Sequence, residues 1–356
     1  MRVIQIIDSL EIGGAERMAV NYANALCGKV EFSGLVATRS EGLLLEQLAE
    51  NVSYLFLNKK KSVDVKAIFR LRDFVKSNNV KIIHAHSSSF FTAVLTKLIY
   101  PKIKIVWHDH FGLRMNQSTK DNKVLISLSF LFSSIFVVNR QLESWSKKNM
   151  YCKNVAFVPN FVLNSNPSDQ KTELKGIDGK RIVFLANLKT PKNHLLILKA
   201  FCSLKLFEKD WSLHLIGKDY FDEYSQVIKG FIQQNHLEKN VHLYGTKSDV
   251  SYILSQASIG VLASTYEGFP VILIEYGRAG LSVLSTNVGF CSEIIKNEES
   301  GLLFDPLVEQ DLIDKFQKIT NSESLRESLS SNLKKEIERY YEEEVIKKVL
   351  LEYSKI

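Results

Sequence analysis

Short apolar runs that read as strands alternate with helical patterns along nearly the whole chain, and this alternation most constrains the fold. The first run, residues 2–8, is followed by a glycine pair and by a segment with helical spacing that ends at Gly28. Further strand-like runs occupy residues 32–38, 53–58, 80–86, 104–110, 134–139 and 154–160. This order is typical of a parallel sheet with helices on both faces.

The alternation stops once, at residues 164–180, and then restarts. That segment is polar and contains proline and glycine, which is typical of a linker. Five more strand-like runs follow: residues 181–187, 211–217, 241–245, 259–264 and 281–286. We therefore predict an α/β chain of two doubly wound, Rossmann-like domains, residues 1–163 and 164–335, that face a central cleft. Residues 336–356 are expected to form a charged terminal helix that packs back on the first domain.

Ligands of open α/β sheets bind beyond the carboxyl ends of the strands, and with two such domains the space between them is the natural site. Just after the run 259–264, Glu267 lies in a loop, and Glu275 follows inside an apolar segment. Burying an unpaired carboxylate is costly, so Glu275 is expected to face a polar ligand. The adjacent hydroxyls of a ribose would supply the two donors that it needs. The alternative is an amphipathic helix whose glutamate faces solvent.

The loop around Glu267 leads into a helix that is expected to start near Pro270 or Val271. Backbone N–H groups at such a start can meet phosphate or sugar oxygens. Glu267 itself can accept hydrogen bonds from sugar hydroxyls.

Two further loops follow strands. Asn187, Lys189 and Lys192 come after the first strand of the second domain, where a lysine beside a helix start suits a diphosphate. Ordinary exposed lysines are the alternative. Gly13 and Gly14 follow the first strand of the chain and let the backbone approach a ligand closely, although a plain tight turn fits them equally. Their spacing is not that of a dinucleotide fingerprint.

Histidines end two strands of the first domain, His84 with His86 and His108 with His110. Residues i and i+2 of a strand point the same way, and imidazole and carboxylate both ligate metals, so a metal at His108, Asp109 and His110 is an alternative, with the histidine pair alone as its chelate. No third ligand is evident, and we predict no metal. Satisfied core or loop histidines are the alternative for most of the four.

Composition restricts the setting of the protein. The four cysteines are far apart without a CxxC pair, which argues against zinc and against a disulfide framework and suits a reducing cytoplasm. We expect no secretory signal and no membrane span, because the apolar stretches are short. Residues 1–165 carry 22 basic against 12 acidic side chains, and the rest carries 24 against 27.

The basic first half suggests an anionic partner, either a phosphate or an anionic inner membrane surface. Candidates for a membrane-facing surface are the cluster Lys59-Lys60-Lys61 and the region 112–133. A merely solvated basic face is the alternative. Nucleic acid is not expected as a partner, because no aromatic-basic stacking motif accompanies the charge.

Together these motifs resemble those of the retaining glycosyltransferases of family 4, the group 1 glycosyl transferases, which have the GT-B fold. Glu267 and Glu275 are spaced as in the EX7E signature of that family. Four other segments are similar to further motifs of the family: residues 13–16, 80–87, 186–194 and 286–304.

The resemblance implies an acceptor-binding first domain and a second domain that holds a nucleotide-diphosphate sugar. The implied catalytic residues are His110, with His108 as its alternative, Glu267 and Lys192. The implied donor-binding residues are Gly14, Asn187, Lys192, Glu267, Gly268, Phe269, Pro270 and Glu275. Asn187 departs from the pattern, because members commonly carry an arginine there, and Lys189 is the candidate replacement.

The resemblance also implies a retaining, metal-independent transfer that uses no cofactor. The acceptor hydroxyl, on a glycan or a lipid-linked acceptor, would attack from the side that the diphosphate leaves; a covalent carboxylate nucleophile is the alternative. Assembly of surface polysaccharide or lipopolysaccharide is the implied setting. Two other functions stay open, a GT-B-type nucleotide-sugar epimerase and a catalytically silent nucleotide-sugar-binding subunit.

Overall fold

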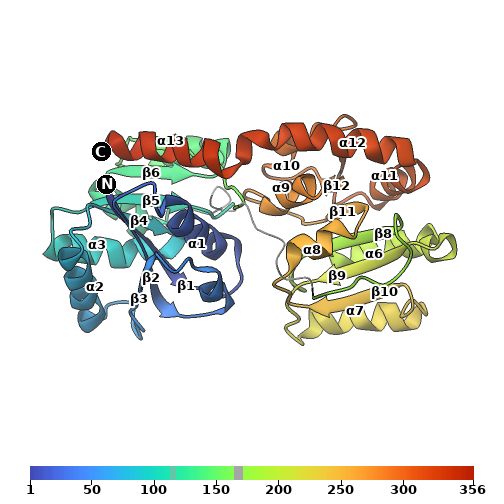
Figure 1. The fold of residues 1–356 in the computed structure, drawn as a ribbon, viewed down its shortest axis with the longest axis horizontal. Coiled ribbons are helices and arrows are strands. Elements are labelled where there is room, and N and C mark those ends of the chain that lie inside the picture. Colours follow the sequence, from blue (N-terminus) through green and yellow to red (C-terminus); the bar gives the residue numbers. More distant parts are fainter. Residues whose placement is uncertain (113, 115–116, 164–170) are drawn as a thin grey trace. The chain divides into compact units, whose positions relative to one another are not determined.

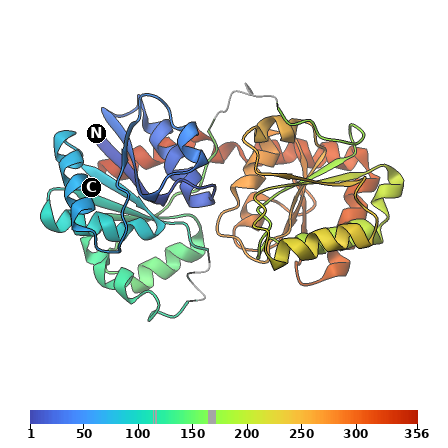
Figure 2. The ribbon, with the colours of Figure 1, turned by 90° about the horizontal axis from the view of Figure 1, so that it is seen from below.

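The computed structural model describes residues 1–112, 114, 117–163 and 171–356, and it divides into two compact units. One unit contains Met1–Leu163 together with Tyr340–Ile356, and the other contains Asn164–Arg339 (Figure 1). Each unit is built on one parallel sheet with helices on both faces (Figure 2). The predicted fold of two parallel-sheet, Rossmann-like domains is thereby confirmed.

The first unit contains a seven-stranded sheet of order β3-β2-β1-β4-β5-β6-β7, in which every neighbouring pair is parallel. Its strands are β1 (Arg2–Ser9), β2 (Phe32–Ser40), β3 (Ser53–Phe56), β4 (Ile82–His86), β5 (Lys104–Asp109), β6 (Ser134–Val137) and β7 (Val155–Phe157). Its helices are α1 (Gly14–Leu26), α2 (Val65–Ser77), α3 (Phe90–Ile99), α4 (Lys123–Leu128), α5 (Arg140–Asn149) and α13 (Glu342–Ser354). The strand order reverses between β1 and β4, where ligands of such sheets bind.

The chain returns to the first unit through its last helix. Helix α12 of the second unit ends at Glu336, and α13 packs beside α1. An ion pair of 2.8 Å between Lys29 and Glu342 joins the start of α13 to this unit. Near the other end of the helix, the buried hydroxyl of Tyr353 lies 2.7 Å from His84 Nδ1 on β4. The C-terminal segment is therefore a structural part of the first unit.

The second unit contains a six-stranded parallel sheet of order β10-β9-β8-β11-β12-β13. Its strands are β8 (Arg181–Leu185), β9 (Ser212–Ile216), β10 (Val241–Gly245), β11 (Ile259–Leu262), β12 (Ser282–Thr286) and β13 (Leu302–Phe304). Its helices are α6 (His194–Ser203), α7 (Glu223–Gln234), α8 (Val250–Ser255), α9 (Val271–Arg278), α10 (Cys291–Ile294), α11 (Glu309–Asn321) and α12 (Glu323–Glu336). Aliphatic and aromatic side chains from the sheet and from α6, α7 and α11 form one continuous core.

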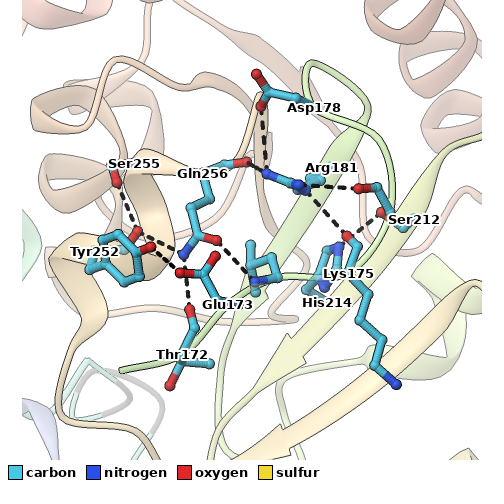
Figure 3. A network of polar contacts seen from close by, with 12 residues as sticks. Thr172, Glu173, Lys175, Asp178, Arg181, Ser212, His214, Tyr252, Ser255 and Gln256 are labelled. Atoms are coloured by element: carbon cyan, nitrogen blue, oxygen red, sulfur yellow. Dashed lines mark hydrogen bonds and ion pairs between the residues drawn. The ribbon is translucent and has the colours of Figure 1, made fainter. Parts of the chain in front are cut away.

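The predicted linker, residues 164–180, is in part bound to the second unit; residues 164–170 lie outside the described residues. Between Thr172 and Gly176 the backbone is held by Gln256 at the end of α8 and by Arg181 at the start of β8 (Figure 3). Gln256 accepts a hydrogen bond from the N–H of Leu174 and donates one to the carbonyl of Thr172. Arg181 donates to the carbonyls of Lys175, Gly176 and Gln256. The described part of the predicted linker is therefore bound to the second unit.

One predicted surface feature is wrong. Lys59 was expected in an exposed basic cluster, but it is buried and donates a 2.6 Å hydrogen bond to Thr92 Oγ1. Burial lowers the pKa of Lys59. Lys60 and Lys61 are exposed as expected. Among the described residues, no helix combines the length and the apolar character that crossing a membrane requires.

Candidate functional sites in the two units

Helix α9 carries Glu275 and is held firmly in the second unit. Gly260 on β11 lets the Tyr276 ring approach so closely that a Cβ there would lie 2.5 Å from the ring. The Tyr276 hydroxyl donates to the carbonyl of Val261 and accepts from the N–H of Leu185. Leu273, Ile274 and Tyr276 are buried, whereas Glu275 is half-buried. The prediction that Glu275 lies on a helix that is too apolar for free solvation fits this position; its ribose ligand stays a prediction.

Lys192 and Glu267 form an ion pair in which Lys192 Nζ lies 2.7 Å from Glu267 Oε1. The two side chains are only 25% and 13% exposed, so the pair is largely shielded from water. They come from the loops after β8 and β11, which are neighbouring strands. Thr265 N–H donates to the carbonyl of Pro191 over 3.0 Å and ties the same two loops together. The structure thus brings together two residues that were predicted separately.

Asn187 has a structural role that the sequence did not predict. Its side-chain oxygen accepts a 2.9 Å hydrogen bond from the N–H of Lys218, which follows β9. Gly217 allows this approach, because a Cβ there would lie 2.1 Å from the carbonyl oxygen of Ala186. The side chain of Asn187 therefore joins the loop after β8 to the loop after β9.

Lys218 is a further cation at these loops that the sequence reasoning missed. Its Nζ lies 5.4 Å from the centre of the Tyr220 ring, and Lys189 Nζ lies 5.8 Å from the same centre. Both cations are thus held near one exposed aromatic ring. The sequence signal that could have identified Lys218 is its position directly after Gly217, at the end of a predicted strand.

The segment 286–304 packs against the loop that carries Glu267. Gly289 has a positive φ of 56°, and a Cβ there would lie 1.8 Å from the carbonyl oxygen of Glu267. The ring of Phe290 stacks on the ring of Phe269 with centres 4.9 Å apart. Beside these residues, at the carboxyl ends of β11, β12 and β13, is a cavity of about 360 Å³. It is lined by residues that include Thr265, Asn287, Val288, Asp305 and Asp311.

The remaining predicted donor residues of the second unit follow the same loop. Gly268 is half-buried, and Phe269 and Pro270 are buried where α9 begins, with Pro270 as the residue that precedes the helix. The first backbone N–H groups of a helix have no partner within the helix and point along its axis toward the N-terminal end. Whether they meet a diphosphate stays a prediction.

In the first unit, Gly14 is exposed at the start of α1 and has no close neighbour that would exclude a side chain. Gly13 differs, because a Cβ there would lie 2.2 Å from the Glu16 carboxylate. The Glu16 carboxylate is the far end of a flexible side chain that can move away, so neither glycine of this loop is sterically required by its neighbours.

The four histidines of the first unit form one cluster, on the sheet face that α1 and α13 cover. His84, His86 and His108 are fully buried, and His110 follows the end of β5. His84 Nε2 lies 3.1 Å from His108 Nδ1, and His86 Nδ1 lies 3.0 Å from His110 Nε2. Burial lowers the pKa of each imidazole, that of His110 to about 3, so all four are neutral near pH 7.

The predicted alternative of a metal held by His108, Asp109 and His110 does not match the geometry. Asp109 is buried and is bound through both carboxylate oxygens by Arg114. The trio of described residues with ring nitrogens within 4.8 Å of one another is instead His84, His86 and His108. The prediction that the protein needs no metal is not tested by this arrangement.

Two family models match the chain, one after the other. The model of Glycosyltransferase Family 4 matches residues 12–163, and the model of Glycosyl transferases group 1 matches residues 166–336. The chain is 26% identical over 318 residues to the O-antigen biosynthesis glycosyltransferase WbnH of Escherichia coli, which covers 88% of both chains.

Another relative comes from Campylobacter jejuni, a GalNAc-alpha-(1->4)-GalNAc-alpha-(1->3)-diNAcBac-PP-undecaprenol alpha-1,4-N-acetyl-D-galactosaminyltransferase. It is 26% identical over 356 residues, which is 94% of this chain and 93% of the relative. Among solved structures, Anabaena Alr3699/HepE in complex with UDP and glucose superposes with a TM-score of 0.83 at 15% identity, over 100% of both chains. This likeness shows that the two proteins share a fold.

Proposed function

The chain belongs to the group 1, family 4-like glycosyltransferases with the GT-B fold, and on that premise we propose a specific reaction for it. It transfers a sugar, with retention of anomeric configuration and without a metal, from a nucleotide-diphosphate sugar to a hydroxyl of a glycan or lipid-linked acceptor. The setting is surface polysaccharide or lipopolysaccharide assembly. Support for this setting comes from the O-antigen and undecaprenol-linked relatives in Escherichia coli and Campylobacter jejuni.

The observation that carries the donor site is the shielded ion pair between Lys192 and Glu267. Before a donor binds, each charge satisfies the other, so neither is left buried and unpaired. When a diphosphate reaches the loops, Lys192 can turn from the carboxylate to the phosphate oxygens. Glu267 then becomes free to accept hydrogen bonds from the sugar hydroxyls. Breaking this one ion pair thus makes Lys192 available to the diphosphate and Glu267 available to the sugar.

In the proposed transfer, the bond between the anomeric carbon and the diphosphate oxygen breaks while the acceptor oxygen approaches from the same side. Lys192 and backbone N–H groups at the start of α9 stabilise the negative charge that grows on the departing diphosphate. The proton of the acceptor hydroxyl passes to the leaving phosphate oxygen, so the step needs no base from the protein. His110 takes part as a neutral imidazole, since burial lowers its pKa to about 3.

Glu275 and the loop cations complete the proposed donor site. Glu275 accepts hydrogen bonds from the two ribose hydroxyls of the donor. Asn187 holds the β8 and β9 loops together, and Lys189 and Lys218 supply the charge of the arginine that is common in relatives. Gly14 in the first unit offers backbone to the substrate.

Incubation of the protein with a panel of nucleotide sugars, with and without lipid-linked acceptors, tests this proposal. A melting-temperature screen first selects the donor, because a ligand that binds the folded state alone raises apparent stability. Product analysis then separates the possibilities. Transfer with retained configuration supports the proposal, an epimerised nucleotide sugar without acceptor indicates an epimerase, and donor binding without turnover indicates a silent subunit.

We also propose that the first unit docks on an anionic membrane where a lipid-linked acceptor resides. On and just before α2, exposed Val63, Val65 and Phe69 accompany the exposed Lys60 and Lys61. Apolar side chains that insert and cations that meet lipid phosphates are the combination that such a surface needs. The second predicted region, 112–133, includes residues outside the described ones, but its described part exposes Val124 and Phe130.

Flotation with liposomes tests this docking surface. Binding should require anionic lipid and should weaken when Val65 and Phe69 are both changed to serine. Leu307→Ser in the second unit is the matched control, since Leu307 is 83% exposed on the other unit. Flotation that does not depend on lipid charge would remove the proposal.

A further inference from the structure

The buried histidines form two hydrogen-bonded pairs that repeat along the strands. His86 and His108 are register neighbours on β4 and β5, so the pair His84–His108 and the pair His86–His110 are the same diagonal displaced by two residues. The rings stack between the pairs, with 4.5 Å between the centres of His84 and His86 and 4.1 Å between those of His108 and His110. Only the second pair contains the proposed catalytic residue His110.

The two pairs differ in the side chain that contacts the outer nitrogen, which is the ring nitrogen of the β4 histidine that is not used within the pair. Tyr353 of α13 places its hydroxyl 2.7 Å from His84 Nδ1. Gln5 of β1 places its side-chain oxygen 2.9 Å from His86 Nε2, and Gln5 is fully buried. A hydroxyl can donate or accept, whereas a carboxamide oxygen can only accept. With the carboxamide oriented so that its oxygen faces His86, the hydrogen of His86 is on Nε2, where that oxygen receives it.

The position of the hydrogen on His86 determines the position of the hydrogen on His110, because each neutral imidazole carries a single ring hydrogen. Burial keeps His86 and His110 neutral by lowering their pKa values. With its hydrogen on Nε2, His86 has a bare Nδ1 that can only accept. His110 must then donate from Nε2, which leaves its own Nδ1 bare. Among the described residues, that Nδ1 has no hydrogen-bond partner.

We infer that Gln5, acting through His86, is a positioning residue that fixes His110 as the tautomer with hydrogen on Nε2 and a bare Nδ1. The bare nitrogen is buried, and it is the acceptor for a hydroxyl of the sugar substrate that reaches it on binding. This inference rests on the proposed function, because His110 needs a substrate to meet. It also excludes His110 as a proton donor, since its one hydrogen is held by His86.

A metal held by the same imidazoles would need a different geometry. The nitrogens that a metal would use already face each other within the pairs, and the paired rings are nearly parallel, at 8° and 14°. Their lone pairs and hydrogens therefore lie along the pair axes and do not converge on one point. A hydrogen-bonded relay accounts for the arrangement of both pairs.

The test begins with the unmodified protein, and a variant is needed only to assign one signal. Histidine is labelled with ¹⁵N, and long-range ¹H–¹⁵N correlation spectra distinguish the protonated from the bare ring nitrogen of each imidazole. The signal of His110 is assigned by its loss in His110→Asn. We expect His110 to show hydrogen on Nε2 at neutral pH. Hydrogen on Nδ1 would overturn the relay.

The role of Gln5 is tested by Gln5→Met, which keeps a similar volume but removes the acceptor. His110 should then exchange between its two tautomers, with the hydrogen on either ring nitrogen. The value of kcat should fall about tenfold, which corresponds to the net free energy of about one hydrogen bond. Tyr22→Phe is the matched control, because it removes a buried hydroxyl beside the same imidazoles that has no hydrogen-bond partner among the described residues, and it should leave the His110 tautomer unchanged.

The possible failures are distinguishable. A folded Gln5→Met protein whose His110 keeps the original tautomer would overturn the positioning role of Gln5. A changed tautomer with an unchanged kcat would instead leave the relay intact and overturn the participation of His110 in transfer.

Discussion

Gly289 packs against Glu267 so closely that a Cβ on Gly289 would lie 1.8 Å from the Glu267 carbonyl oxygen. The backbone of Gly289 also has a φ of 56°, a conformation that side chains disfavour. The segment 286–304 therefore fixes the position of the loop that carries Glu267. This relationship joins two motifs that the sequence placed far apart.

Gly289→Ala should displace the Glu267 loop and reduce transfer by at least about tenfold, since a small misplacement of a positioned group is costly. The measurement is kcat/KM with the donor found by the melting screen. Gly230→Ala is the control, because Gly230 lies in α7, where an added methyl group would meet no other atom within 4 Å, and the change should be neutral or stabilising. Full activity of Gly289→Ala would mean that the loop tolerates the shift and that Glu267 is not positioned by this contact.

Lys192→Ala and Glu267→Ala should each lower transfer by about a hundredfold or more, because each removes a group that acts on the reacting donor. Lys192→Ala also leaves Glu267 largely buried without its partner, so thermal melting must accompany the kinetics. The double variant should be more stable than the sum of the single effects predicts, since it leaves no unpaired charge. Lys199→Ala, at an exposed position of α6, is the control. Normal turnover in both single variants would refute the site assignment.

The strands were predictable because buried parallel strands leave continuous apolar runs between helical segments. The runs overshoot the strand ends, however: the predicted run 181–187 includes the buried Ala186, whereas β8 ends at Leu185. The three residues of β13 were missed because so short a run gives little periodic signal. Lys59 was misplaced because a run of lysines does not reveal that one of them turns inward to Thr92.

The candidate site residues could be proposed from the sequence, but their contacts with one another could not. Lys192 and Glu267 are 75 positions apart, and their contact depends on β8 and β11 being neighbours in the sheet, which the sequence does not specify. The histidine pairs depend in the same way on the register of β4 against β5. Motif spacing therefore indicated the chemistry, whereas strand order decided which groups meet.

Removal of divalent cations should leave transfer unchanged, because Lys192 and the N–H groups at α9 are proposed to stabilise the diphosphate without a metal. The measurement is the initial rate after exhaustive treatment with a chelator, compared with the rate after readdition of Mg²⁺ or Mn²⁺. Glu275→Gln serves as a comparison, since it should raise the KM for the donor in either condition. A rate that disappears on chelation and returns with one cation would contradict the metal-independent proposal.

The free energy of unfolding should fall as the pH drops below about 6.5, the pKa of histidine in an unfolded chain. Burial lowers the folded-state pKa values of His84, His86 and His108 well below that value. The unfolded chain therefore binds protons that the folded protein excludes, so this contribution to stability is full above pH 6.5 and is lost on acidification. At pH 5.5 each of the three histidines should lower the free energy of unfolding by about 1.4 kcal/mol.

Denaturant titrations at pH 7.5 and 5.5 measure the loss of stability. His108→Gln should reduce it, whereas His236→Asn should not, because His236 is exposed. Equal stability at both pH values would show that the cluster accommodates protons.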